Sequence, residues 1–262
     1  MNLHPRYLAS LETSQGKPLL VVDRAKNRPT LKTRKAERQY AQALRKLAEQ
    51  VGGIVGAFPA GDPSVVPTLN QMLRAYADAL TPWAQATAQR MLESVNARNL
   101  QDWQEMSAFM SAELKRKVLQ APVGQVAQDL LALQVDLIKS IPLDAAERVQ
   151  RLTLEGLENS TRAATIAKEI QRTSEVSQSR AMLIARTEVS RTAMTLTQAR
   201  AEAVGSVGYI WRTSGDGDVR QSHKAMANKF VRWDEPPTLD GLKGHAGCLP
   251  NCRCYAEPVL PE

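Results

Sequence analysis

The sequence is poor in the residues that most often build reactive sites and rigid scaffolds. Of its 262 residues only three are cysteine and three are histidine, and aromatic residues make up 5%. No apolar run approaches the roughly 18 residues needed to cross a bilayer. The first residues contain no apolar stretch of signal-peptide form. We therefore expect no association with membranes. We also expect the protein to be made in the cytoplasm, where free or metal-bound thiols are more common than disulfides.

Common catalytic motifs are also absent. The sequence has no Gly-rich phosphate loop, no Gly-x-Ser-x-Gly motif and no His-Glu-x-x-His motif. It offers no convincing pair of carboxylates for acid–base chemistry. We therefore predict that the protein is not an enzyme.

Positive charge is present but unevenly placed. The net charge is +7, and residues 1–50 carry 11 Lys/Arg against 4 Asp/Glu, whereas residues 51–262 carry 23 of each. The basic segment at 1–50 could contact nucleic-acid phosphates without sequence specificity. It could equally dock on an acidic protein surface or form a solvated helix face. Few aromatics are available to stack on bases, since Tyr40 is the only one between Lys17 and Lys46. The candidate nucleic-acid residues are Arg24, Lys26, Arg28, Lys32, Arg34, Lys35 and Arg38.

Abundant Ala, Leu, Gln and Arg favour helices over most of the chain. Apolar residues at three-and-four spacing indicate amphipathic helices from Pro67 onward, and Gly205 is a natural C-cap. We predict that Gly52-Gly53 ends the first helix, that residues 52–67 form a loop, and that Pro142 begins a new helix. The apolar run at 19–22 predicts a strand or an anchor for an extended arm. The predicted helices cover about residues 33–51, 67–80, 82–118 with a candidate break near 96–99, 126–137, 142 onward, 161–172 and 176–204.

After Gly205 the pattern changes to that of a small α+β unit. Strands are predicted at 207–212, 229–233 and 253–258, with a turn at 215–218, a short helix at 219–227 and a loop at 234–247. The expected fold is mainly α with a C-terminal α+β unit, a helical body followed by a small sheet-containing domain. We divide the chain into a basic arm with the first helix (1–50), a helical body (51–140) and the C-terminal domain (141–262).

The three cysteines gather in this C-terminal part. Cys248, Cys252 and Cys254 fall within seven residues, and His223 and His245 lie upstream. One imidazole and three thiolates suit tetrahedral zinc, with His223 as another candidate ligand. A structural zinc would help a loop-rich unit with little core of its own. The alternatives are free or buried thiols, with His223 bonded to a backbone carbonyl, or a disulfide from Cys248 to Cys252 or Cys254.

Four pieces, in order, carry a family resemblance. They are Ala-Arg-Thr-Glu at 185–188, Tyr-Ile-Trp-Arg-Thr at 209–213, Asp-Val-Arg at 218–220 before His223, and Asn-Cys-Arg-Cys at 251–254. With this set, residues 145–258 resemble the phage head morphogenesis family, the Mu F-like minor head proteins. The family pattern pairs His223 with the two cysteines of the last piece and does not include His245 or Cys248. Relatives often have Gly where this chain has Asn228, and Asn tolerates the left-handed conformation.

The resemblance implies a structural protein of the virion, present in few copies inside the capsid near the portal. The expected partners are the portal protein, the major capsid or scaffolding protein, and DNA through the basic segment. We predict that residues 67–157 hold the portal contact, with Trp83 and Trp103 either as anchors or in the protein's own core. The other functions considered are a zinc-stabilised DNA-binding protein and a toxin-like or nucleotide-modifying enzyme.

Five charged residues of the C-terminal domain have predicted structural roles. Arg186 and Glu188 are two apart on a helix and point to different faces, and Arg186 is predicted to pair with Asp218 or Glu202. The polar residues predicted to tie the domain together are Arg186, Glu188, Asp218, Arg220 and Arg253.

Overall fold

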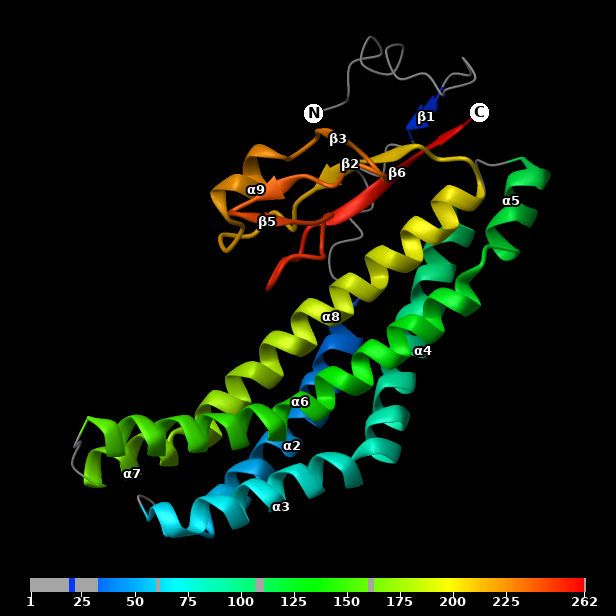
Figure 1. Cartoon of the computed structure of the whole chain (residues 1–262). Coiled ribbons are helices and arrows are strands. Elements are labelled where there is room, and N and C mark those ends of the chain that lie inside the picture. The colour runs from blue at the N-terminus through cyan, green and yellow to red at the C-terminus, as the bar shows by residue number, and fades with distance from the viewer. Residues whose placement is uncertain (1–18, 22–32, 60–61, 107–110, 160–162, 262) are drawn as a thin grey trace. The chain divides into compact units, whose positions relative to one another are not determined.

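The computed structural model describes residues 19–21, 33–59, 62–106, 111–159 and 163–261 (Figure 1). Long helices occupy most of the chain up to residue 203, and a small antiparallel sheet is assembled mainly from the residues that follow. This architecture confirms the predicted fold class. Within the described ranges, no helix is both long enough and apolar enough to cross a membrane.

The chain divides into two compact units. Unit 1 comprises residues 1–36, 92–130 and 187–262, and unit 2 comprises residues 37–91 and 131–186. Four helices contribute residues to both units: α2 (Arg34–Gly56), α4 (Thr81–Met106), α6 (Val123–Glu158) and α8 (Thr173–Ala203). The three-part division at residues 50 and 140 stays a prediction.

Unit 2 is helical. Besides its parts of α4, α6 and α8, it contains most of α2 (Arg34–Gly56), η1 (Pro63–Val65), α3 (Val66–Ala79) and α7 (Ala163–Gln171). The predicted apolar stripe of α3 packs inward at Leu69 and Leu73, whereas Met72 is exposed. Burial of such a stripe is the main source of stability for a surface helix.

Two predicted helix ends in unit 2 are wrong. Helix α2 continues through Gly52 to Gly56, and α6 continues through Pro142. A Cβ at residue 52 would lie 2.3 Å from Oγ of Ser174, so the glycine permits close packing against α8. A proline inside a helix costs about 3 kcal/mol because a backbone hydrogen bond is lost. Buried residues before and after Pro142, among them Ile138, Ile141, Ala145 and Val149, supply packing that offsets this loss.

The candidate break at 96–99 is also wrong, because α4 is continuous to Met106. Within unit 1, the buried Arg200 of α8 donates hydrogen bonds to Oδ1 of Asn99 and, at 2.8 Å, to Oδ1 of Asn96. The two asparagines thus bond to another helix instead of competing with the backbone of their own. The polar side chains at 96–99 therefore mark a contact between two helices and not the end of a helix.

Unit 1 contains a four-stranded antiparallel sheet in the order β1-β6-β2-β3. The strands are β1 (Leu19–Val21), β2 (Gly208–Arg212), β3 (Phe230–Arg232) and β6 (Tyr255–Pro261). The three strands predicted after Gly205 are confirmed, and the apolar run at 19–22, predicted as a strand or an anchor, forms a strand at Leu19–Val21. Strand β6 extends beyond the predicted end at 258 because residues 259–261 pair with β1. The N-terminal strand is thus joined to the C-terminal strand by a ladder that sequence periodicity cannot reveal.

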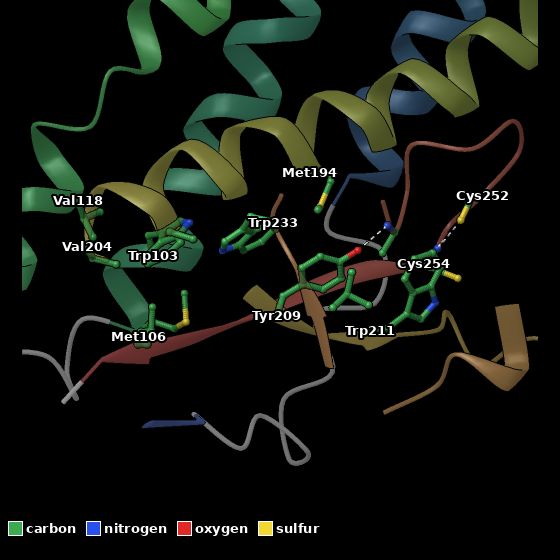
Figure 2. Close-up of a cluster of buried hydrophobic side chains, with 14 of the residues drawn as sticks. Trp103, Met106, Val118, Met194, Val204, Tyr209, Trp211, Trp233, Cys252 and Cys254 are labelled. Atoms are coloured by element: carbon green, nitrogen blue, oxygen red, sulfur yellow. Dashed lines mark hydrogen bonds between the residues drawn. The ribbon is translucent and has the colours of Figure 1, made fainter. Parts of the chain in front are cut away.

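The core of unit 1 lies against one face of this sheet (Figure 2). Alternate residues of β2, Tyr209 and Trp211, pack with Trp103 of α4, Met194 of α8 and Val118 of α5 (Ala112–Leu119). The intervening Ile210 belongs to a separate buried cluster with Val259. Trp103 is 1% exposed, so its predicted role as an interface anchor is wrong and its core role is confirmed. Trp83 is half-buried.

Turns of unit 1 follow local chemistry. Gly205 has a φ of 87° and ends α8 as predicted, with the N–H of Ser206 donating to the carbonyl of Ala201 at 2.9 Å. Asn228 adopts the left-handed conformation, φ 66°, as predicted. The predicted loop 234–247 instead contains a hairpin of β4 (Thr238–Leu239) and β5 (Leu242–Lys243). Its turn is Asp240-Gly241, a pair that is a strong hairpin signal in a sequence.

Candidate metal centre

Three buried side chains with metal-binding atoms meet in unit 1. His223 lies on α9 (Gln221–Ala225), and Cys252 and Cys254 lie just before β6. Their ligand atoms all lie within 4.8 Å of one another. Nδ1 of His223 is 3.3 Å from Sγ of Cys252 and 3.6 Å from Sγ of Cys254. Zinc bond lengths and tetrahedral angles would place such nitrogen and sulfur atoms about 3.6 Å apart. The cluster could therefore hold a metal ion.

Hydrogen bonds to sulfur favour the form of Cys252 that binds metal. The backbone N–H of Cys254 donates to Sγ of Cys252 at 3.4 Å. The pKa of Cys252 is lowered to about 6, first by a hydrogen bond from the Cys254 side chain and further by the backbone N–H groups of Cys254 and Gly247. The same side-chain hydrogen bond and burial raise the pKa of Cys254. The lowered pKa favours the thiolate of Cys252, and thiolates are the metal-binding form of cysteine.

The cluster is closed to solvent. His223 is 2% exposed, Cys252 is 3% exposed and Cys254 is 5% exposed. Trp211 of β2 stands edge-on to the His223 ring, with ring centres 5.7 Å apart, and lies beside Cys254 in Figure 2. Nε2 of His223 is buried and has no hydrogen-bond partner among the described residues. Nδ1 is therefore the nitrogen that faces the two sulfurs. A closed site of this kind suits a structural ion better than a catalytic one.

The other two predicted ligands lie outside this group. Nδ1 of His245 forms a hydrogen bond with the Tyr209 hydroxyl at 3.2 Å, and the ring packs edge-on against Tyr209 and Trp233. The Cys248 side chain is half-buried, and burial raises its pKa to about 11. All three cysteines are free thiols, so the disulfide alternative is wrong for this structure.

Helix α8 holds the cysteine-bearing segment. The N–H of Asn251, whose φ is 56°, donates to Oγ1 of Thr187 at 3.0 Å. Arg191 donates to the backbone carbonyl of Cys248 at 3.1 Å and pairs with the buried carboxylate of Glu188 at 3.0 Å. Sequence reasoning missed the roles of Thr187 and Arg191. Their spacing of four residues puts them on one face of a helix and was the available signal.

Charged residues connect the segments that carry the three ligands. Arg253, between the two cysteines, pairs with Asp216 at 3.0 Å and with Asp218 at 3.2 Å, both shortly before α9. Arg220, the residue before α9, donates to the carbonyl of Pro250 at 3.1 Å and lies 3.6 Å from Asp240. These contacts link the loop before His223 to the segment around Cys252.

The predicted partner of Arg186 is wrong. Its Nε lies 3.6 Å from the carboxylate of Glu37 within unit 2, and Asp218 pairs with Arg253 instead. Arg186 and Glu188 therefore have different partners, as expected from their spacing on the helix. Residues two apart in sequence can belong to different compact units because α8 contributes to both.

Part of the basic segment is described. Arg34, Lys35 and Arg38 lie in the first turns of α2 and are exposed. The remaining candidates, Arg24, Lys26, Arg28 and Lys32, lie outside the described residues.

Comparison with known proteins agrees with the resemblance found in the sequence. The model of the family described as Phage Mu protein F like protein matches residues 147–257. A protein of Haemophilus influenzae strain Rd, described as an uncharacterized protein, is 34% identical over 131 residues, which are 50% of this chain and 29% of that protein. No solved structure matches. All four motif pieces lie in the matched region, and they meet around the buried cluster of His223, Cys252 and Cys254. Thr187 of the first piece accepts from the N–H of Asn251, Trp211 of the second packs on His223, and Asp218 of the third pairs with Arg253 of the last. Residues 147–257 of this chain are thus similar to the Phage Mu protein F like family.

Proposed function

We propose that this protein is a minor head protein of a phage particle, bound to the portal and the capsid interior. The observation that carries the proposal is the family match over residues 147–257. The expected location is the virion, near the portal vertex, after assembly in the host cytoplasm. The major capsid or scaffolding protein is a further expected partner.

Burial of the His/Cys cluster supports a structural role over catalysis. Its three side chains are at most 5% exposed, which leaves no path for a substrate to their reactive atoms. A toxin-like or nucleotide-modifying enzyme would need such a path. We therefore propose that the C-terminal domain is a scaffold that presents surfaces to head proteins.

Zinc is the proposed occupant of the cluster. Two sulfurs and one imidazole nitrogen suit zinc, and the separations of 3.3 and 3.6 Å match tetrahedral coordination. When bound, zinc would cross-link α9 to the segment before β6. That link would stabilise a small sheet whose connecting segments are mostly loops.

Presence in the particle tests the proposed function. In gradient-purified particles of the phage that encodes this chain, quantitative mass spectrometry should find the protein at a few copies per particle. Particles assembled with the His223→Ala variant should lack this protein or fail to deliver DNA. No substrate turnover should be found that the variant loses. Mature particles and head precursors that both lack the wild-type protein would refute the proposal.

Helix α6 is the proposed site of the portal contact. Leu154 and Leu157 are more than half exposed, and Leu154 lies in a shallow hollow with Glu147, Arg151 and Glu155. Exposed apolar side chains ringed by charges are typical of protein interfaces. Both leucines fall within the region 67–157 that the sequence assigned to this role.

Full-length variants can test this contact, whereas cutting the chain at residue 140 would sever α6. Leu154→Glu combined with Leu157→Glu should abolish co-purification with portal protein. Leu242→Glu, at a similarly exposed leucine of β5, is the matched control and should retain portal. Failure of the control alone to retain portal would place the contact on the sheet-containing part of unit 1, after residue 203.

The basic segment is the proposed DNA contact. Arg34, Lys35 and Arg38 present three exposed cations on consecutive turns of α2. Cations in this arrangement can meet phosphates without reading sequence. Such binding would accompany the structural role.

A further inference from the structure

The buried cluster supplies three ligands, whereas closed structural zinc sites have four. Each of the three side chains is buried, so a partner protein cannot reach the fourth position. Water is also a poor candidate for a permanent ligand, because open positions are characteristic of catalytic sites. The missing ligand should therefore come from a nearby segment of this chain.

We infer that Cys248 is the fourth ligand of the metal proposed above and that His245 is not a ligand. Both residues belong to the segment before Cys252. Because a four-coordinate site with three assigned ligands has one position left, only one of the two can bind the metal. The inference rests on the proposed metal site and specifies its coordination.

Backbone contacts place Cys248 next to the cluster. The preceding residue, Gly247, has a φ of 83°, and a Cβ there would lie 2.9 Å from the carbonyl oxygen of Cys254. Residue 247 is therefore in contact with the backbone of a ligand. The side chain of Cys248 packs against the core cluster that includes Cys252 and Cys254. A thiol at this position needs only a local movement to reach the ion.

That movement is a side-chain rotation. The Cys248 sulfur lies outside the group whose ligand atoms are all within 4.8 Å of one another. Its backbone is held, since its N–H donates to the carbonyl of His245 at 3.1 Å and its carbonyl accepts from Arg191 at 3.1 Å. Rotation about χ1 between staggered positions moves a cysteine sulfur by roughly 3 Å. Ligation by Cys248 would require such a rotation toward the cluster, and the held backbone would not have to move.

His245 is occupied elsewhere. Its Nδ1 bonds to the Tyr209 hydroxyl at 3.2 Å, and that hydroxyl also accepts from the N–H of Ala246 at 3.1 Å. Its ring also packs edge-on against Trp233, at 6.1 Å between ring centres. To serve as a ligand through Nδ1, His245 would have to leave these contacts and break a partly buried hydrogen bond. Cys248 has no comparable side-chain contact to give up among those described.

Cobalt substitution of the full-length protein tests the assignment. The wild-type protein loaded with Co²⁺ should show the visible bands of tetrahedral coordination with thiolate charge transfer. Cys248→Ser should lose part of the charge-transfer intensity and bind Zn²⁺ at least about tenfold more weakly in a chelator competition. His245→Gln, the matched control from the same segment, should change neither readout. If Cys248→Ser left the charge-transfer intensity and the Zn²⁺ affinity unchanged while His245→Gln weakened Zn²⁺ binding, the inference would be overturned.

Alkylation of the wild-type protein gives a second test that requires no variant. Cys248 is the half-buried thiol of the three, and its raised pKa slows the reaction, so prolonged treatment with iodoacetamide at alkaline pH should label it in chelator-treated protein. Zinc should protect it, as peptide mass spectrometry would show. Equal labelling of Cys248 with and without bound zinc would refute its role as a ligand. Wild-type protein that binds neither Zn²⁺ nor Co²⁺ would instead refute the metal site itself.

Discussion

Gly247→Ala should destabilise unit 1 more than substitution of a positive-φ glycine that has open space around it. A left-handed conformation costs a non-glycine residue roughly 1–2 kcal/mol. The added Cβ would also lie 2.9 Å from the Cys254 carbonyl oxygen and 3.4 Å from the Ser190 carbonyl oxygen. Both neighbours are backbone atoms that cannot rotate away, and overpacking of this kind costs roughly 1–3 kcal/mol more. The expected total is about 2–5 kcal/mol.

Gly215→Ala provides the control. Gly215 has a φ of 74°, but nothing lies within 4 Å of a Cβ built there. This variant should lose only the conformational part, roughly 1–2 kcal/mol. The difference between the two variants, about 1–3 kcal/mol, isolates the close approach of residue 247 to the cysteine-bearing segment.

Urea unfolding followed by tryptophan fluorescence measures the difference. Three of the four tryptophans, Trp103, Trp211 and Trp233, lie in the core of unit 1, so the signal reports mainly on that unit. Zinc affinity should fall for Gly247→Ala and stay unchanged for Gly215→Ala, because only Gly247 contacts the ligand segment. Equal losses of stability in both variants would contradict the reasoning.

Further expectations concern the metal, its supporting charges and DNA. Freshly purified reduced protein should contain about one zinc per chain, and Cys252→Ser should lower both zinc content and Tm; metal-free wild-type protein would end the zinc hypothesis. Arg253→Gln should weaken zinc binding roughly 10–100-fold because its support for the ligand segment is removed. The exposed pair of Arg232 with Asp234 offers a matched control, and Arg232→Gln should have no effect on zinc. DNA affinity should fall log-linearly with salt, and neutralising Arg34, Lys35 and Arg38 should reduce the slope by about 0.9 for each phosphate that these cations neutralise. A flat salt dependence would favour docking of the basic segment on a protein.

Local chemistry explains where sequence reasoning succeeded. The strand at 208–212, the C-cap at Gly205 and the left-handed Asn228 each depend on residues within a few positions of one another. The same holds for each of the ordered motif pieces, which carry the resemblance to the family whose model matches residues 147–257. The Asp240-Gly241 hairpin was missed, because residues 234–247 were predicted as a loop, although its signal was equally local.

Contacts between distant segments decided the rest. Gly52 and Pro142 discourage helices in isolation, but close packing at Ser174 and burial around Ile138 favour their continuation. A sequence cannot show these contacts because they form only when helices far apart along the chain meet.

The candidate site divides in the same way. The sequence by itself determined that His and Cys residues gather in the C-terminal part, and five residues were compatible with metal. Only the tertiary structure placed His223 against Cys252 and Cys254 while committing His245 to Tyr209. The physical reason is that residues can bind one metal ion only when the fold brings their ligand atoms within a few ångströms of one another. Those distances are set by the pairing of β2 with β6 and by the contacts that hold the intervening loops.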